Sequence, residues 1–223
     1  MSGNNYQLSV LFLCKKENSY AQRAAGWLAE HFPNALIFSA DRTEPLPDHV
    51  LNWSGDVIIS FISSWVLPAA LLERARIAAI NFHPGSPDYP GTGCTNFALY
   101  NGATEYGVTC HYMKATVDTG DIIRVSRFPL QPSDTVYDVT MHCYDLIEQL
   151  FYEIMEKLGK GEELPVSGEK WTRKAYTRKE LNELCEIKPD MPEEEIERRI
   201  RATTYEKPWA FVRIANRIFK LQP

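Results

Sequence analysis

The sequence contains no long apolar run, no closely spaced pair of cysteines and no excess of positive charge. No apolar stretch reaches the roughly 20 residues of a membrane-spanning helix, and the first residues, MSGNNYQLSV, lack the basic flank and apolar core of a signal peptide. Lys and Arg number 24 against 29 Asp and Glu, whereas nucleic-acid binding usually relies on clustered Lys and Arg. We therefore expect neither a membrane nor a nucleic acid as a partner.

The cysteines are scattered and do not suggest a metal or disulfide framework. None of them forms a Cys-x-x-Cys pair, and their number is odd. We expect free thiols in a reducing compartment, and therefore no metal site and a cytoplasmic protein. The five residues are Cys14, Cys94, Cys110, Cys143 and Cys185.

A glycine-rich phosphate loop is also missing after the first apolar run. The segment LFLCKKENSYAQRA contains neither Gly-x-Gly-x-x-Gly nor Gly-Lys-Ser/Thr, which removes the main support for a dinucleotide or nucleoside triphosphate site. Lys15 and Lys16 could contact an anion at this position, although two adjacent lysines more often form a solvated turn.

What the sequence does contain is an alternation of apolar runs and amphipathic segments. Residues 8–13 (LSVLFL) are typical of a strand buried on both faces. Residues 19–32 have apolar side chains at helical spacing, with Ser19 as the expected N-cap. Because this alternation continues, it predicts an α/β domain with a mainly parallel sheet and right-handed crossovers. Further strands are expected at 34–40, 55–62 and 77–82, and a short helix in 66–75.

The second half of the chain changes in character near residue 161. Residues 107–115 and 121–130 read as extended segments around an Asp-Thr-Gly turn, and 134–161 is the clearest helix, with Asp134 as its expected cap. Beyond residue 161 the composition becomes charged. We expect one domain over 1–161 and a short C-terminal segment over 162–223, with helices in 171–184 and 191–205 and a strand or hairpin in 210–221.

Asn81 lies near the end of the apolar run 77–82 and His83 directly follows that run. The sequence PGSPDYPG comes next. In an open α/β sheet, ligands bind at the carboxyl ends of strands, and residues two apart on a strand share one side. A carboxamide and an imidazole placed together can donate hydrogen bonds to an oxygen that gains charge, and the imidazole can move a proton. Taken alone, His83 could equally be a satisfied histidine in a turn.

Asp118 lies in the sequence VDTGDI. Asp-Thr-Gly is a common turn, because Asp bonds its own backbone and Gly accepts positive φ. Aspartic proteases use the same triplet, but they need two copies or a dimer of a much shorter chain, and this sequence has one copy in an α/β pattern. His111, on the preceding segment, is more typical of a packed core histidine when considered by itself.

Taken together, four motifs in this order and spacing resemble the formyltransferases that use 10-formyltetrahydrofolate: N-x-H-P-G, Y-P-G, G-V-T-x-H and D-T-G-D-I. The resemblance covers residues 57–130 and implies a Rossmann-like fold. It also implies that Asn81, His83 and Asp118 form the catalytic trio, that His111 helps to position them, and that no metal is required.

The resemblance also implies where the folate binds. In the family, the folate lies against the loop after the third main strand and the loop before the catalytic Asp, which here are residues 60–68 and 114–118. Trp65 could equally be an ordinary core residue. The expected folate-binding residues are Ser64, Trp65, Val66, Leu67, His111, Ala115, Thr116 and Val117.

Within the family, the runs GTGCTNFALYNG and RATTYEKPWAF are most similar to sugar N-formyltransferases. That likeness implies an amino-deoxysugar acceptor, usually nucleotide-linked, a role in lipopolysaccharide O-antigen biosynthesis, and allows a homodimer. Methionyl-tRNA formyltransferases have a C-terminal barrel and basic surfaces, and glycinamide ribonucleotide transformylases have the phosphate loop that is missing here. A non-catalytic module that binds folate or a sugar nucleotide stays an alternative. The expected acceptor-binding residues are Tyr89, Cys94, Phe97, Tyr205 and Trp209.

Overall fold

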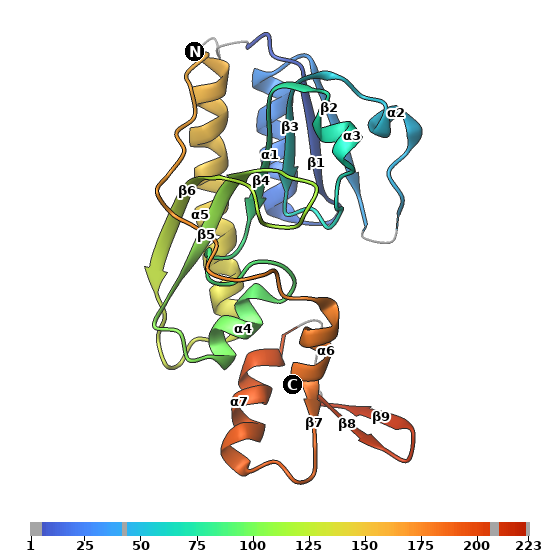
Figure 1. Ribbon diagram of the computed structural model, residues 1–223, viewed down its shortest axis with the longest axis vertical. Helices are drawn as coiled ribbons and strands as arrows, with labels where there is room; N and C mark the ends of the chain where they lie inside the picture. The colour runs from blue at the N-terminus through green and yellow to red at the C-terminus, as the bar shows by residue number, and fades with distance from the viewer. Residues whose placement is uncertain (1–5, 42–43, 206–209, 222–223) are drawn as a thin grey trace.

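The computed structural model describes residues 6–41, 44–205 and 210–221 and has a six-stranded sheet at its centre (Figure 1). The strand order is β2-β1-β3-β4-β5-β6. Strands β2, β1, β3 and β4 run parallel to one another, and β5 pairs antiparallel with both β4 and β6. The predicted α/β fold with a mainly parallel sheet is therefore confirmed. The strands are β1 (Val10–Lys15), β2 (Ala35–Ala40), β3 (Gly55–Phe61), β4 (Ala75–His83), β5 (Glu105–Tyr112) and β6 (Ile122–Pro129).

Two layers of helices cover the sheet, and β1, which lies between β2 and β3, is buried on both faces. Phe12 points into a core shared with α1 (Ser19–His31) and α5 (Val136–Gly159), where its ring centroid lies 5.6 Å from that of Phe151. Leu11 and Leu13 point into a smaller core beneath α2 (Asp48–Leu51) and α3 (Ala69–Leu72). A strand with apolar cores on both sides must be apolar at every position, which explains the continuous run LSVLFL.

Both long helices begin one residue away from the predicted cap. Asn18, rather than Ser19, caps α1, with its Oδ1 accepting from the Ala21 amide at 2.9 Å. Thr135, rather than Asp134, caps α5 in a reciprocal capping box with Asp138. The carboxylate of Asp134 instead accepts a hydrogen bond from the Gln131 amide at 2.7 Å. Both predictions were therefore wrong by a single residue.

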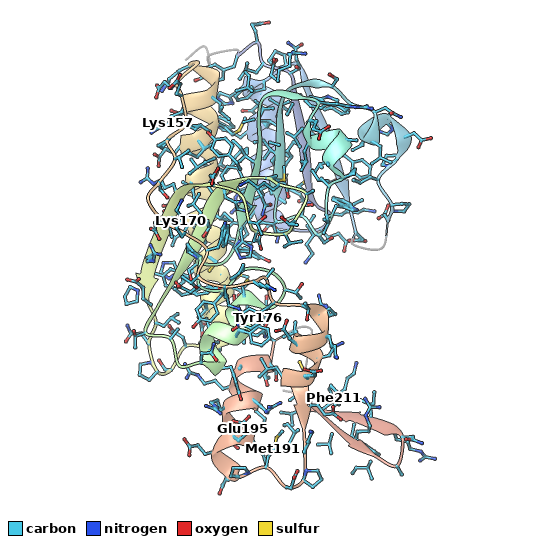
Figure 2. All side chains as sticks on the ribbon, viewed as in Figure 1. Lys157, Lys170, Tyr176, Met191, Glu195 and Phe211 are labelled. Carbon is cyan, nitrogen blue, oxygen red and sulfur yellow. The ribbon has the colours of Figure 1, made fainter. Side chains whose placement is uncertain are left out.

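The C-terminal segment runs back over the sheet and then forms a small lobe of its own (Figure 1). The helix expected over 171–184 was wrong at its start, because α6 begins only at Arg178, behind a Thr177–Glu180 capping box. Residues 171–177 form no helix, and Tyr176, labelled in Figure 2, lies just before α6. The lobe consists of α6 (Arg178–Cys185), β7 (Glu186–Ile187), α7 (Glu193–Thr203), β8 (Phe211–Ile214) and β9 (Arg217–Lys220).

The lobe is anchored to the rest of the chain through α4 (Cys94–Tyr100). The buried Asn96 side chain donates to the carbonyl oxygen of Ala202 at 2.7 Å, and the Tyr100 hydroxyl donates to Glu195 at 2.8 Å. The strands β8 and β9 form the predicted hairpin. None of the helices in the described ranges is long and apolar enough to span a membrane.

Candidate active site

Two paired strands place three polar side chains at one end of the sheet. β4 ends at His83, so Asn81 and His83 lie at its carboxyl end, on the same side of the strand. In the antiparallel pairing of β4 with β5, Asn81 is opposite His111. This register brings His111 against Asn81, and their side-chain nitrogens Nε2 and Nδ2 lie 3.1 Å apart.

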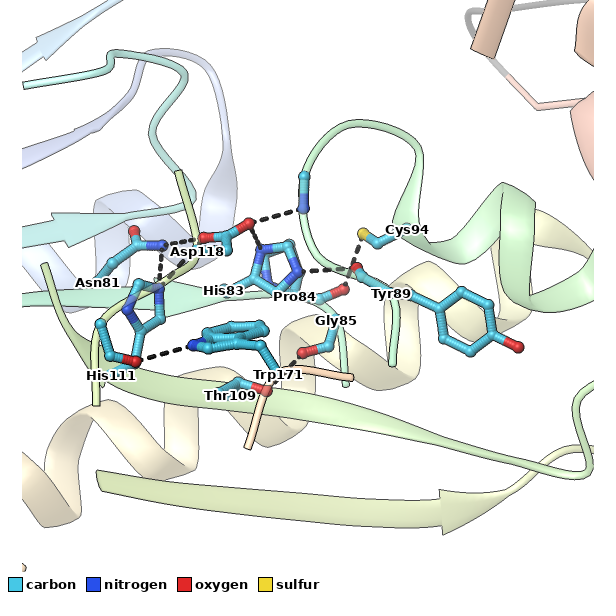
Figure 3. Close-up of polar contacts among 12 residues, drawn as sticks. Asn81, His83, Pro84, Gly85, Tyr89, Cys94, Thr109, His111, Asp118 and Trp171 are labelled. Carbon is cyan, nitrogen blue, oxygen red and sulfur yellow. Dashed lines mark hydrogen bonds and ion pairs between the residues drawn. The ribbon is translucent and has the colours of Figure 1, made fainter. Parts of the chain in front are cut away.

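Asp118 provides the carboxylate at the centre of this group (Figure 3). Its Oδ2 accepts from the backbone amide of Gly91 at 2.7 Å and lies 3.4 Å from Nδ1 of His83. Its Oδ1 lies 3.2 Å from Nε2 of His111 and 3.5 Å from Nδ2 of Asn81. All three ionisable side chains are almost fully buried, with exposed fractions of 6% for His83, 3% for His111 and 6% for Asp118. The structure therefore brings together the three residues expected to be catalytic and the histidine expected to position them.

A backbone carbonyl contacts each imidazole at the ring nitrogen that does not face Asp118. Nε2 of His83 lies 3.2 Å from the oxygen of Tyr89, and Nδ1 of His111 lies 2.8 Å from the oxygen of Tyr112. Because a carbonyl oxygen only accepts hydrogen bonds, each of these ring nitrogens carries a proton. The other nitrogen of each ring faces Asp118.

Burial by itself raises the pKa of the Asp118 carboxyl, but its neighbours reverse this effect. The charge on His83, the hydrogen bond and charge of His111 and the Gly91 amide all favour the carboxylate, and together they hold the pKa of Asp118 well below its usual range. Asp118 is thus an ionised acceptor at neutral pH. A carboxylate in this setting can stabilise an imidazolium and help to guide a proton.

The loop of residues 84–91 explains why prolines and glycines follow His83. Its carbonyl at Tyr89 and its amide at Gly91 face His83 and Asp118, while the carbonyl of Gly85 accepts from the Thr109 hydroxyl at 2.7 Å. A Cβ at Gly85 would overlap the His83 ring. The loop therefore needs a rigid backbone, which the prolines provide, and a glycine where the backbone lies close to the His83 ring.

A cavity of about 310 Å³ opens beside these residues. Asn81, His83, His111 and Asp118 line it at one end, and the loop after β3 provides much of the remaining wall. Of the residues expected to bind folate, Ala115 is exposed and does not line the cavity. The others do line it: Ser64, Trp65, Val66, Leu67, His111, Thr116 and Val117. Trp65 lines the cavity and also packs on Phe38 in the smaller core.

Comparison with protein-family models matches residues 14–155 to the formyl transferase family. The chain belongs to the formyl transferase family. Methionyl-tRNA formyltransferases from Synechococcus sp. (strain JA-3-3Ab) and Limosilactobacillus fermentum are 32% and 36% identical to it over 114 and 124 residues, which is 51% and 55% of this chain. This chain covers 35% and 39% of those two relatives.

Several solved structures share the fold over nearly the whole of this chain. A sugar N-formyltransferase from Shewanella superposes with a TM-score of 0.74 at 16% identity, covering 96% of both chains. An N-formyltransferase from Helicobacter canadensis, solved with folinic acid and dTDP-3-aminofucose, gives 0.72 at 18% identity over 94% of this chain and 85% of that one. HypX from Aquifex aeolicus, solved with tetrahydrofolic acid, gives 0.75 at 18% identity over 97% of this chain and 38% of that one.

The residues expected to bind the acceptor do not form one group. Phe97 stacks on Tyr176 with ring centroids 3.7 Å apart, inside a small core, and it does not line the cavity beside Asp118. The ring of Tyr89 packs between those of Tyr106 and Tyr176. Cys94 and Tyr205 line a separate hollow of about 230 Å³. Trp209 lies outside the described residues.

Sequence reasoning missed two groups that complete the site. The first consists of the backbone atoms of Tyr89 and Gly91, which no side-chain pattern reveals. The second is Trp171, whose ring centroid lies 5.0 Å from that of His111 and 6.0 Å from that of His83. Trp171 lies in a charged segment beyond the family match, without a periodicity or motif that marks it.

Proposed function

We propose that this formyl transferase moves the formyl group of 10-formyltetrahydrofolate to the primary amine of an amino-deoxysugar carried on a nucleotide. One observation carries the proposal: a buried carboxylate, Asp118, is faced by two imidazoles and a carboxamide at the end of a cavity. Formyl transfer needs donors for an oxyanion and a route for one proton, and this group contains both.

The reaction follows from these side chains. The amine nitrogen attacks the formyl carbon, and the carbonyl electron pair moves onto oxygen to give a tetrahedral oxyanion. Asn81 stabilises that oxygen by donating a hydrogen bond, and protonated His83 stabilises it through its positive charge. The oxyanion then re-forms the carbonyl as the carbon–nitrogen bond to the folate breaks. The proton lost by the amine passes by way of Asp118 to the departing folate nitrogen, and the N-formylated sugar and tetrahydrofolate result.

The cavity suits the flat, polar-edged ring system of a folate. Trp65, Val66 and Leu67 supply an apolar wall, while Ser60 and Ser63 add polar groups at the same end of β3. Pockets for such ligands are typically apolar with a few aligned polar groups. Val66 is 66% exposed and Val117 is 42% exposed, and a bound folate would cover this apolar surface.

The acceptor is supported by less direct observations. The fold of this chain matches that of the Helicobacter canadensis protein, whose structure contains dTDP-3-aminofucose, and the net charge of −5 suits a small acceptor better than tRNA. Against it, the curated relatives are methionyl-tRNA formyltransferases. This chain matches only part of their length, so tRNA is the second candidate acceptor, and glycinamide ribonucleotide the third.

The test is a panel of acceptors assayed with purified protein and 10-formyltetrahydrofolate. We expect release of tetrahydrofolate that depends on an amino-sugar nucleotide, with no formylation of methionyl-tRNA or glycinamide ribonucleotide. Efficient formylation of methionyl-tRNA, with every amino-sugar nucleotide unchanged, would show that the acceptor assignment is wrong. Folate binding without transfer to any acceptor would instead indicate a binding module.

The proposal also includes the setting in which the reaction takes place. All five cysteines are free and four of them are buried, which suits the reducing cytosol. The resemblance to sugar N-formyltransferases allows a homodimer, and analytical ultracentrifugation of the purified chain will measure its oligomeric state.

A further inference from the structure

Residues 167–177, which we call the strap, cross the catalytic end of the sheet. They lie beyond the family match, which ends at residue 155. At one end, the Ser167 amide donates to the carbonyl of Ile122, just after the Asp118 turn, at 2.7 Å. At the other end, the Tyr176 amide donates to the carbonyl of Pro90 at 2.8 Å. The strap is thus hydrogen-bonded to both loops that surround His83.

Trp171 lies in the middle of the strap and faces both histidines of the site (Figure 3). Its indole ring meets the His111 ring at 89° and the His83 ring at 68°. These are edge-to-face contacts, in which an aromatic face attracts positive charge. Trp171, together with Asp118, also lines a second hollow of about 260 Å³, distinct from the folate cavity. The ring is therefore the partition between the two imidazoles and that hollow.

Trp171 also contacts the turn that carries Asp118. Its Nε1–H donates to the carbonyl oxygen of Gly120 at 2.8 Å. Asp118 has φ of +47°, a backbone conformation that costs a non-glycine residue of order 1–3 kcal/mol and persists only where its surroundings hold it. A Cβ at Gly120 would overlap the carbonyl of Tyr112, so this turn is tightly packed on one side and hydrogen-bonded to Trp171.

We propose that Trp171 is a positioning residue of the catalytic centre. It holds the Asp118 turn through the Gly120 carbonyl and closes the side of the site on which the His83 and His111 rings would otherwise meet water. Because Trp171 does not line the folate cavity, its effect falls on the alignment of the catalytic groups rather than on folate affinity. The kinetic part of this inference rests on the proposed formyl transfer.

Two substitutions separate the two contacts of Trp171. Trp171→Phe keeps an aromatic partition and loses the indole donor, and we expect kcat to fall about fivefold, the scale of one lost hydrogen bond. Trp171→Leu loses the donor and the aromatic face, and we expect a fall of about 30-fold or more, because small misplacements of catalytic groups are costly. The dissociation constant of tetrahydrofolate, measured by calorimetry, should stay within about twofold in both variants.

Trp27→Phe is the matched control. Trp27 is also partly exposed and also contacts a histidine, His31, with ring centroids 4.3 Å apart, but it lies on α1, away from the catalytic centre. We expect its kcat to equal that of the wild type. An unchanged kcat in both Trp171 variants overturns the proposal, and so does a loss of folate affinity as large as the loss of kcat.

An NMR measurement tests the partition without any assay of activity. In protein labelled with ¹⁵N-histidine, the imidazole protons on Nε2 of His83 and Nδ1 of His111 should exchange slowly with water in the wild type and in Trp171→Phe. They should exchange rapidly in Trp171→Leu. Persistence of both slow signals in Trp171→Leu overturns the proposal. If the wild type transfers no formyl group to any acceptor, the proposed function fails, while the NMR result still decides the role of Trp171.

Discussion

The backbone amide of Gly91 donates a 2.7 Å hydrogen bond to Oδ2 of Asp118. Gly91 closes the loop PGSPDYPG, and its φ of +88° is open to glycine at little cost. The carbonyl of Tyr176 lies so close to Gly91 that a Cβ there would overlap it. The loop after His83 therefore serves a carboxylate that the chain reaches only 27 residues later.

This contact makes Gly91 a sensitive position, and Gly102 offers a matched comparison. Both glycines have positive φ, but a Cβ at Gly102 would meet nothing within 4 Å. Each change to alanine should cost about 1–2 kcal/mol of folding free energy for the left-handed backbone. Only Gly91→Ala displaces the amide from Asp118, so we expect its kcat to fall about 30-fold or more while Gly102→Ala keeps its kcat. Equal kcat in the two variants would remove the role assigned to the Gly91 amide.

Asn81 and His83 should each be needed for turnover rather than for folding. We expect Asn81→Ala and His83→Ala to lower kcat by about two orders of magnitude, the scale of losing a transition-state donor or a proton-transfer group. Circular dichroism should show an intact fold. His142→Ala is the control, since His142 is exposed on α5 and stacks only on Phe128 among the described ring contacts. A His83→Ala variant with nearly normal turnover would exclude His83 from the mechanism.

The depressed pKa of Asp118 predicts how its contribution to stability depends on pH. A carboxyl whose folded-state pKa lies below its unfolded value stabilises the fold above the unfolded value, about 3.9 for Asp, and loses that contribution as the pH falls toward the folded value. Urea unfolding of the wild type and of Asp118→Asn should therefore show a difference at about pH 5 that shrinks below about pH 4. A difference that grows as the pH falls from about 5 to about 3 would contradict this assignment.

Activity should not depend on a metal ion. The ring nitrogens of His83 and His111 already contact backbone carbonyls and Asp118, and the described residues contain no group of three or more His, Cys, Asp or Glu side chains that could hold a metal ion. After exhaustive treatment with EDTA, kcat should stay within about twofold of that of untreated protein. Loss of activity that added zinc restores would require a different site.

Local sequence was enough to predict the central sheet, because a strand that is buried on both faces consists almost entirely of apolar residues. It was less reliable where neighbouring residues compete for one role. Asn18 and Ser19 can both cap a helix, and so can Asp134 and Thr135; the choice depends on which oxygen reaches an amide in the first turn. The Thr135–Asp138 pair has the spacing of a capping box and could have decided the second case.

The strap could not be predicted from local sequence. WTRKAYT contains residues that are compatible with a helix, but its backbone amides bond to the carbonyls of Pro87 and Pro90, more than 80 residues earlier. Such long-range pairing overrides local preference. The trio expected to be catalytic was predicted from a family resemblance, whereas the contacts of Trp171, Tyr89 and Gly91 with that trio exist only in the folded chain.

We propose that Asp118 and its two histidines carry out formyl transfer, and a single-turnover experiment tests this proposal most directly. Enzyme loaded with 10-formyltetrahydrofolate is mixed with an amino-sugar nucleotide, and the formation of tetrahydrofolate is followed in the wild type and in Asp118→Asn. We expect acceptor-dependent transfer in the wild type and a rate at least about 100-fold lower in Asp118→Asn, with equal binding of folate. Equal rates of transfer in the two proteins would contradict the claim.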